Sequence, residues 1–221
     1  MAGKAVVAAA SAKPGLSPEA EKFLDQVSGG ARREVGAWIG DHFLVRRLKA
    51  QLKLLERAHQ YLRDAGRDPR EVKWNVLFPL LEAASLDEDD DMADRWAALL
   101  ANAADPLADE VPPSFADVLR QLTPLEARIL VRTRAVIDER KDEPGRFAAG
   151  HGLRELLGIA EPAYDLSVEN LFRLRLLRPP VIKLEFTSTP ELEYQLAGNE
   201  AVQVTGFGRA FLAACERSGS G

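Results

Sequence analysis

The chain has 221 residues, of which 46% are hydrophobic and 29% are charged, as in an ordinary globular protein. Its net charge of -5 argues against a nucleic-acid footprint over the whole chain, and its single cysteine, Cys215, excludes an internal disulfide. The longest uncharged apolar run near the start, residues 5–12, is far shorter than the ~18 residues that a membrane-spanning helix needs. We therefore expect a cytoplasmic protein with no transmembrane segment.

The first part of the chain predicts helices after an unstructured start. Residues 1–17 hold Ala, Lys, Gly and Pro with little periodicity, so we expect a disordered arm there. Ser17, followed by Pro, Glu and Ala, supplies an N-cap, a proline at the first helical position and an acid in the first turn. Apolar residues then recur at the spacing of one helical stripe. We expect a helical bundle over residues 18–113, with helices beginning near Pro18 and Arg32 and covering residues 45–65, 74–84 and 87–104.

A different pattern follows the proline- and acid-rich residues 106–113, which indicate a connector. Thr123 and Glu126 flank Pro124 in the pattern of a capping box, which predicts a helix start. The order of helix, short helix, helix, strand, long tip and strand is typical of a winged helix, a helix-turn-helix variant with a β-hairpin. The expected fold class is mainly α, with the bundle followed by a winged-helix-like α+β subdomain over residues 114–221. The predicted helices cover residues 114–122, 123–138, 153–157, 162–177 and 208–216, and the predicted strands cover residues 181–186 and 201–205.

The exit from the predicted recognition helix departs from the usual winged-helix pattern. Winged helices commonly leave this helix through a glycine, whereas this chain has Arg175 between two leucines. Either Arg175 adopts a helix-end conformation that glycine adopts more easily, or the helix runs on to Arg178 before two prolines stop it.

Charge changes sign along the first half. Bases outnumber acids over residues 45–73, and acids outnumber bases over residues 82–110. We expect the basic and acidic helices to pack as neighbours with complementary outer faces, and the alternative is a basic stripe for phosphate or anionic lipid. Ser85, three residues before Glu88, predicts a capping box at the start of the acidic helix.

No pattern of catalytic residues stands out. The sequence has no GxSxG, Walker A or GxGxxG motif, its three histidines lack metal-ligand spacing, and Cys215 has no histidine nearby in sequence. Asp87, Asp89 and Asp91 have the opening spacing of a calcium loop, but Met92 stands where that loop needs glycine. We therefore expect a non-enzymatic protein with no cofactor and no metal.

Charged and polar side chains on the predicted helices offer a surface for a partner. Trp96 is expected in the core, and Asn102 is expected to satisfy a helix end. Asn170 and Arg173 could read base edges, but acids on the same helix would repel phosphate, so DNA binding is disfavoured. The candidate interaction surface consists of Glu82, Asp89, Asp90, Asp94, Asn170, Arg173, Arg46, Arg47, Lys49 and Lys53.

Two segments, LLEAASLDEDDDMADRWAALLANAADP and PPSFADVLRQLTPLEARIL, carry a family resemblance. They are similar to the signature of the Abi-alpha family, bacterial proteins grouped with phage abortive-infection systems, and the resemblance covers roughly residues 35–214. It implies a role in bacterial defence against phage, and without a catalytic constellation we expect action through contacts with a host or phage protein. The alternatives are a winged-helix transcription regulator and a membrane-active toxin that lays its basic amphipathic helix, residues 45–65, on anionic lipid. Self-association into a homo-oligomer also stays open.

Overall fold

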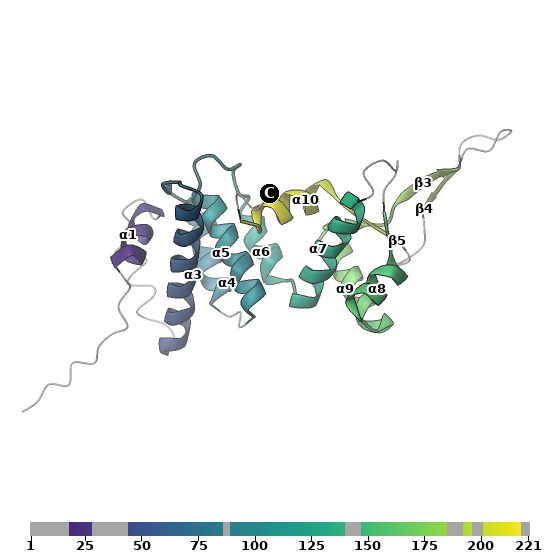
Figure 1. Cartoon of the computed structure of the whole chain (residues 1–221), viewed down its shortest axis with the longest axis horizontal. Helices are drawn as coiled ribbons and strands as arrows, with labels where there is room; N and C mark the ends of the chain where they lie inside the picture. The colour runs from purple at the N-terminus through teal and green to yellow at the C-terminus, as the bar shows by residue number, and fades with distance from the viewer. Residues whose placement is uncertain are drawn as a thin grey trace, which may run out of the picture.

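The computed structural model describes residues 18–27, 44–85, 89–139, 147–184, 192–195 and 201–217. Within these residues the protein is mainly helical, with a three-stranded sheet and a separate two-stranded hairpin. The predicted arm over residues 1–17 and the helix predicted near Arg32 lie outside the described residues. The molecule is elongated, with the first helices at one end and the hairpin at the other (Figure 1). The helices of the first half are α1 (Pro18–Val27), α3 (Leu44–Asp64), α4 (Trp74–Ala84), α5 (Asp90–Ala104) and α6 (Ser114–Arg120).

Helix α3 is the long amphipathic helix that the sequence predicts. Leu55, Ala58 and Leu62, from its apolar stripe, are buried in the core, and the helix lies between α1 and α5. Trp96 on α5 is 1% exposed, which confirms its predicted place in the core. Among the helices of the described residues, none combines the length and apolar content that crossing a bilayer requires.

Helix α5 begins three residues later than predicted, and its cap differs from the expected one. The N-cap is Asp89, whose carboxylate accepts a hydrogen bond from the backbone N–H of Met92 at 3.0 Å. Ser85 ends the preceding helix instead, because its hydroxyl donates to the carbonyl oxygen of Glu82 at 2.6 Å. The predicted capping role of Ser85 is therefore wrong, since Asp89, which lies nearer the start of α5, caps that helix.

The second capping box is formed as predicted. The backbone N–H of Thr123 donates to the carboxylate of Glu126 at 2.7 Å, and the N–H of Glu126 donates to the Thr123 hydroxyl at 3.2 Å. This reciprocal pair starts α7 next to the end of α6. The elements of the second half are α7 (Pro124–Glu139), β1 (Ala148–Ala149), α8 (Gly150–Leu157), α9 (Glu161–Arg173), β2 (Leu177–Arg178), β3 (Val181–Leu184), β4 (Leu192–Gln195), β5 (Ala201–Val204) and α10 (Gly206–Ala214).

Strand β5 lies at the centre of the three-stranded sheet, between β1 and β2, and both pairings are antiparallel. Strand β3 pairs with β4 instead, and Ile182 lies opposite Tyr194. The two runs predicted as strands therefore contain β3 and β5, but these two do not pair with each other in the described residues. Pro179 and Pro180 separate β2 from β3, and because proline has no N–H to donate, they end one ladder before the next begins.

Arg175 adopts the helix-end conformation that was one of its two predicted alternatives. Helix α9 ends at Arg173, and Arg175 has φ +58°, the left-handed region that side-chain-bearing residues rarely occupy. The backbone N–H of Leu176 then returns to the carbonyl oxygen of Leu171 at 3.0 Å. The helix therefore does not run on to Arg178.

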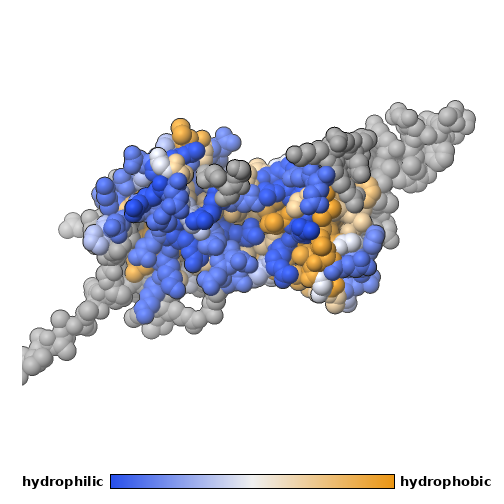
Figure 2. All heavy atoms as spheres, in the orientation of Figure 1, coloured by the Kyte–Doolittle hydropathy of each residue, from blue (hydrophilic) through white to orange (hydrophobic). Residues whose placement is uncertain are grey.

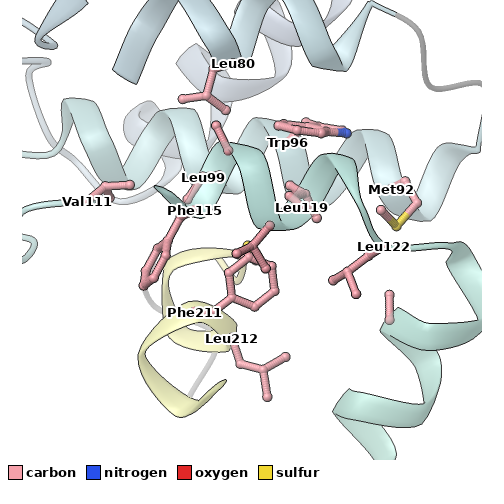
Figure 3. Close-up of a cluster of buried hydrophobic side chains, with 14 of the residues drawn as sticks. Leu80, Met92, Trp96, Leu99, Val111, Phe115, Leu119, Leu122, Phe211 and Leu212 are labelled. Carbon is pink, nitrogen blue, oxygen red and sulfur yellow. The ribbon is translucent and has the colours of Figure 1, made fainter. Parts of the chain in front are cut away.

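The last helix, α10, returns to the first half of the chain (Figure 1). Phe211 on α10 points toward Phe115 on α6 (Figure 3). The rings of Phe115 and Phe211 meet edge to face with centroids 5.5 Å apart. At its start, α10 lies so close to β2 that a Cβ on Gly208 would stand 2.3 Å from the Leu176 carbonyl oxygen. Glycine is thus required where this helix leaves the sheet.

Candidate functional site

A charged groove lies between α3 and the start of α5. It encloses a volume of about 410 Å³, and its floor is apolar while its rim carries charges of both signs. We call it the α3–α5 groove. The residues that line it are Lys49, Ala50, Lys53, Leu54, Arg57, Ala84, Asp89, Asp90, Ala93 and Trp96.

The acidic wall of the groove is the N-terminal turn of α5. Asp89 caps the helix, and Asp90 follows in the first turn, where a negative charge interacts favourably with the helix dipole. The Asp90 side chain is 97% exposed. Capping by Asp89 and the helix dipole at Asp90 thus give both aspartates a structural role. The Asp90 carboxylate is nevertheless exposed to solvent.

The basic wall is formed by Lys49, Lys53 and Arg57 of α3. These residues are four positions apart along the helix, so they lie on one face. Arg57 pairs with Asp94 at 2.9 Å and lies 3.8 Å from Asp90. Lys49 and Lys53 are exposed, and neither has a carboxylate within ion-pair distance among the described residues. Counting only the described residues, the groove therefore holds two ammonium groups without an ion pair beside one guanidinium that is already paired.

A tyrosine completes the contacts of Asp94 at one end of the groove. The hydroxyl of Tyr61 donates to the Asp94 carboxylate at 2.8 Å. Burial, with this hydrogen bond and the charge of Asp94 beside it, raises the pKa of Tyr61 to about 12. Tyr61 therefore stays protonated at ordinary pH and acts as a fixed hydrogen-bond donor.

The basic and acidic segments do pack as neighbours, as the charge pattern predicts. Besides the Arg57 pair, Arg67 forms an ion pair with the fully buried Asp105. Lys73 pairs with Glu110 on the surface. These contacts neutralise part of the basic segment, whereas Lys49 and Lys53 near the groove have no ion pair with a described residue.

The other predicted interaction residues are placed differently. Glu82 is exposed on α4 and is not among the residues that line the groove. The side chains of Arg46 and Arg47 lie outside the described part of the chain. The structure thus brings together Lys49, Lys53, Asp89 and Asp90, with Asp94 beside them.

Asn170 and Arg173 on α9 make their hydrogen bonds within the chain. The Asn170 amide donates to the Glu126 carboxylate at 2.8 Å, and Arg173 donates to the Asn170 side-chain oxygen at 2.7 Å and to that of Gln121 at 3.0 Å. These side chains hold α9 against the junction of α6 and α7. Their hydrogen bonds are thus made within the chain, although Arg173 itself is exposed.

The link between Arg57, Tyr61 and Asp94 was not singled out from the sequence. Its signal was present, because Arg57 and Tyr61 are four residues apart, as are Asp90 and Asp94, so each pair shares a helix face. What the sequence did not show is that these two faces meet. No cluster of three or more His, Cys, Asp or Glu side chains arranged to hold a metal ion occurs in the described residues.

In the space-filling view, the charged surface over α3 and α5 is distinct from an apolar surface elsewhere on the same face (Figure 2). Hydrophilic residues dominate the face over α3 and α5, whereas hydrophobic residues gather over α7 and α9 (Figure 2). Leu166 on α9 is 70% exposed. On the face shown, the more continuous polar surface lies over the bundle (Figure 2).

A family comparison covers most of the chain. The family model described as abortive infection alpha matches residues 47–215, a range that contains the α3–α5 groove and the returning helix α10. No curated protein and no solved structure shows significant similarity to the chain. Because the match extends over well more than half of the sequence, the chain belongs to the abortive infection alpha family, which suggests a role in abortive-infection defence against phage.

Proposed function

We propose that this protein is a non-enzymatic abortive-infection effector that acts by binding a host or phage protein in the α3–α5 groove. The observation that carries the proposal is the pair of ammonium groups, Lys49 and Lys53, that have no ion pair with any described residue and lie above an apolar floor that contains Leu54 and Trp96. A segment with an apolar anchor and flanking carboxylates fits this arrangement. Asp89 and Asp90 on the opposite wall disfavour a polyanion such as nucleic acid.

Charge reversal on the basic wall tests the proposal. Expression of the wild-type protein in a phage-sensitive bacterium is expected to lower plaque formation for some phages, with infected cells dying or arresting. The double variant Lys49→Glu and Lys53→Glu is expected to lose this protection. The matched control, Lys22→Glu and Arg128→Glu, makes the same change in net charge at exposed positions on α1 and α7 and should keep it.

The outcomes separate the parts of the proposal. Protection by a folded groove variant, with circular dichroism equal to the wild type, would exclude the groove as the binding surface. Equal loss in both double variants would show that total charge matters rather than the groove. If the wild type protects against no phage in a broad panel, the defence role itself fails.

The non-enzymatic part has its own test. Joint replacement of His42, His59, His151 and Cys215 removes every imidazole and thiol that could serve as a base or nucleophile. A folded quadruple variant is expected to protect as well as the wild type. Loss of protection would indicate chemistry at one of these side chains.

For residues 114–221, which begin with α6, we propose the winged-helix-like reading. It is supported by the order α7, β1, α8, α9, β2, β5 and by the strand order β1-β5-β2, with β3 and β4 as an extended hairpin. A DNA-reading role has less support, because Asn170 and Arg173 donate hydrogen bonds to other residues of the chain. Glu169 remains exposed on the same helix, where it would repel phosphate.

Membrane activity also has less support. A toxin mechanism would need α3 to lay its apolar face on lipid, yet Leu55, Ala58 and Leu62 of that face are buried in the core. Exposing them before lipid covers them costs roughly 1.5 to 3 kcal/mol for each leucine. Leakage of vesicles rich in anionic lipid would reveal this mechanism if it operates.

A further inference from the structure

A second cavity, of about 540 Å³, lies at the joint between the two halves of the protein. Its walls come from α3, α5, α7 and the segment that follows α10. Three arginines line it, Arg95, Arg134 and Arg217. The volume is in the range of roughly 300 to 1,000 Å³ that small-molecule sites occupy.

Two of the three arginines already have partners in the structure. Arg134 forms a two-point ion pair with Glu216, with N···O distances of 2.6 and 2.8 Å, and this hydrogen bonding raises the pKa of Arg134. Arg217 lies over the Tyr61 ring, 3.8 Å from its centroid, and 3.6 Å from Asp64. These contacts fix the C-terminal segment against α7 and α3.

Arg95 differs from both neighbours. Its Nε atom is buried and has no hydrogen-bond partner, and no carboxylate lies within ion-pair distance of its guanidinium among the described residues. A buried donor of a charged group without an acceptor is costly, and native structures usually satisfy such a group with a protein group or an ordered water, so Arg95 retains the capacity to bind an added acceptor.

The thiol next to Arg95 does not supply the missing negative charge. Burial raises the pKa of Cys215, so the thiol stays neutral at ordinary pH. Of the acids in the cavity wall, Asp94 is engaged by Arg57 and Tyr61, and Glu216 is engaged by Arg134. Asp91, exposed one turn before Arg95 on the same helix, has no ion pair within the described part of the chain.

We propose that this cavity binds a small molecule through an oxyanion group, a phosphate or a carboxylate, that Arg95 holds. The planar guanidinium suits both groups, because its N–H donors match two oxygens of one anion. Asp91 and Asp94 in the same wall favour a ligand that also carries a hydrogen-bond donor, so a zwitterionic or amine-bearing metabolite fits better than a polyanion.

The position of the cavity gives the ligand a structural effect. Glu216 and Arg217 follow α10, while Arg95 is on α5, so an anion on Arg95 lies between the C-terminal segment and the bundle. Binding is expected to slow amide hydrogen exchange in residues 212–217, because these residues then open less often. The inference stands apart from the α3–α5 groove and from the proposed defence role.

The test titrates the full chain by calorimetry with inorganic phosphate and separately with acetate, each at constant ionic strength set with chloride. Saturable binding of one anion is expected, and the better of the two identifies phosphate or carboxylate as the preferred group. Arg95→Gln should weaken that binding by at least about tenfold, as expected for loss of a charge-assisted hydrogen bond. The control Arg128→Gln, at an exposed position on α7, should leave it unchanged.

Several results would overturn the proposal. One is the absence of saturable binding of either anion to the wild-type chain at 10 mM ligand, on the order of the weakest specific affinities; this result needs no variant to fold. Equal weakening in Arg95→Gln and Arg128→Gln would show a general charge effect. If anion binding leaves hydrogen exchange unchanged in residues 212–217, the anion is held elsewhere.

Discussion

Asn102 near the end of α5 and Ala214 at the end of α10 are joined across 112 residues of sequence, with the Asn102 amide donating to the Ala214 carbonyl oxygen at 2.8 Å. The same amide donates to the carbonyl oxygen of Glu216, also at 2.8 Å. Carbonyl groups at the end of a helix have no partner within it, and Asn102 supplies one from another helix. The expectation that Asn102 satisfies a helix end is confirmed, although the helix is not its own.

Replacing this residue should loosen the end of α10. Asn102→Ala is expected to lower the free energy of unfolding by about 1 to 2 kcal/mol, because it leaves partly buried carbonyl groups without this donor. Asn75→Ala, at an exposed position on α4, is the control and should change stability by under roughly 0.5 kcal/mol. Urea denaturation of both variants measures the difference, and equal effects would mean that the Asn102 contacts carry no net stability.

Arg175 should be replaceable with a gain in stability. Its φ of +58° costs a residue with a Cβ about 1 to 2 kcal/mol, so Arg175→Gly is expected to stabilise the protein by up to about 1 kcal/mol after the entropic cost of glycine. Gly158, which ends α8 at φ +63°, gives the reverse case, and Gly158→Ala should destabilise the protein by about 1 kcal/mol. Thermal unfolding would contradict this account if Arg175→Gly lowered the midpoint.

Tyr164 offers an unusual test, because its ring is 1% exposed and its hydroxyl has no hydrogen-bond partner in the described residues. Tyr164→Phe is expected to be neutral or to stabilise the protein by about 1 kcal/mol, since it removes an unsatisfied buried group. Tyr61→Phe, which deletes the donor to Asp94, should instead cost about 1 kcal/mol. A clear loss of stability in Tyr164→Phe would indicate an acceptor, such as an ordered water, at that hydroxyl.

His59 should make stability depend on pH. It stacks on Phe23 with ring centroids 5.2 Å apart, and burial, with Arg63 and Lys22 nearby, lowers its pKa below 6.5 despite Glu19. As the pH falls through 6.5, the unfolded chain takes up a proton that the folded protein resists, so stability decreases.

We therefore expect a smaller difference in unfolding free energy between pH 7.5 and pH 5 in His59→Gln than in the wild type. His151→Gln, at an exposed position on α8, is the control and should keep the wild-type difference. If His59→Gln shows the wild-type pH dependence, the imidazole is not the group responsible.

Limited proteolysis tests the proposed boundary before residue 114. Leu107 is 77% exposed between the buried Asp105 and Val111, so thermolysin is expected to cut within residues 106–113 before it cuts elsewhere in the described residues. The two fragments should elute together from a sizing column, because α10 packs on α5 and α6 packs on α4 across the cut. A first cut within residues 77–103 would contradict the helical bundle.

Local signals in the sequence were the reliable ones. Thr123 and Glu126 lie within one helical turn, so their capping box could be predicted without knowing the rest of the fold. The cap of α5 was missed because several acidic and hydroxyl side chains compete there, and Asp89 lies closer to the helix than Ser85. Where candidates for one role are crowded, composition does not select among them.

Contacts between distant segments could not be predicted in the same way. The basic and acidic segments were expected to meet, but not that Arg57 would face Asp94 or that Lys49 and Lys53 would have no ion pair with a described residue. Likewise, β5 pairs with the two-residue strands β1 and β2, which are too short to leave an alternating pattern. The groove depends on how helices are rotated about their axes, which no single segment specifies.

The packing of α10 on α5 and α6 has a consequence for synthesis of the chain. The ribosome makes this helix after every element that it covers, so the side of Phe115 that meets Phe207 and Phe211 stays uncovered by them in the nascent protein until α10 emerges. A partly made chain therefore exposes an aromatic surface that chaperones recognise and that promotes aggregation. Maturation of the bundle must wait for translation of the last helix.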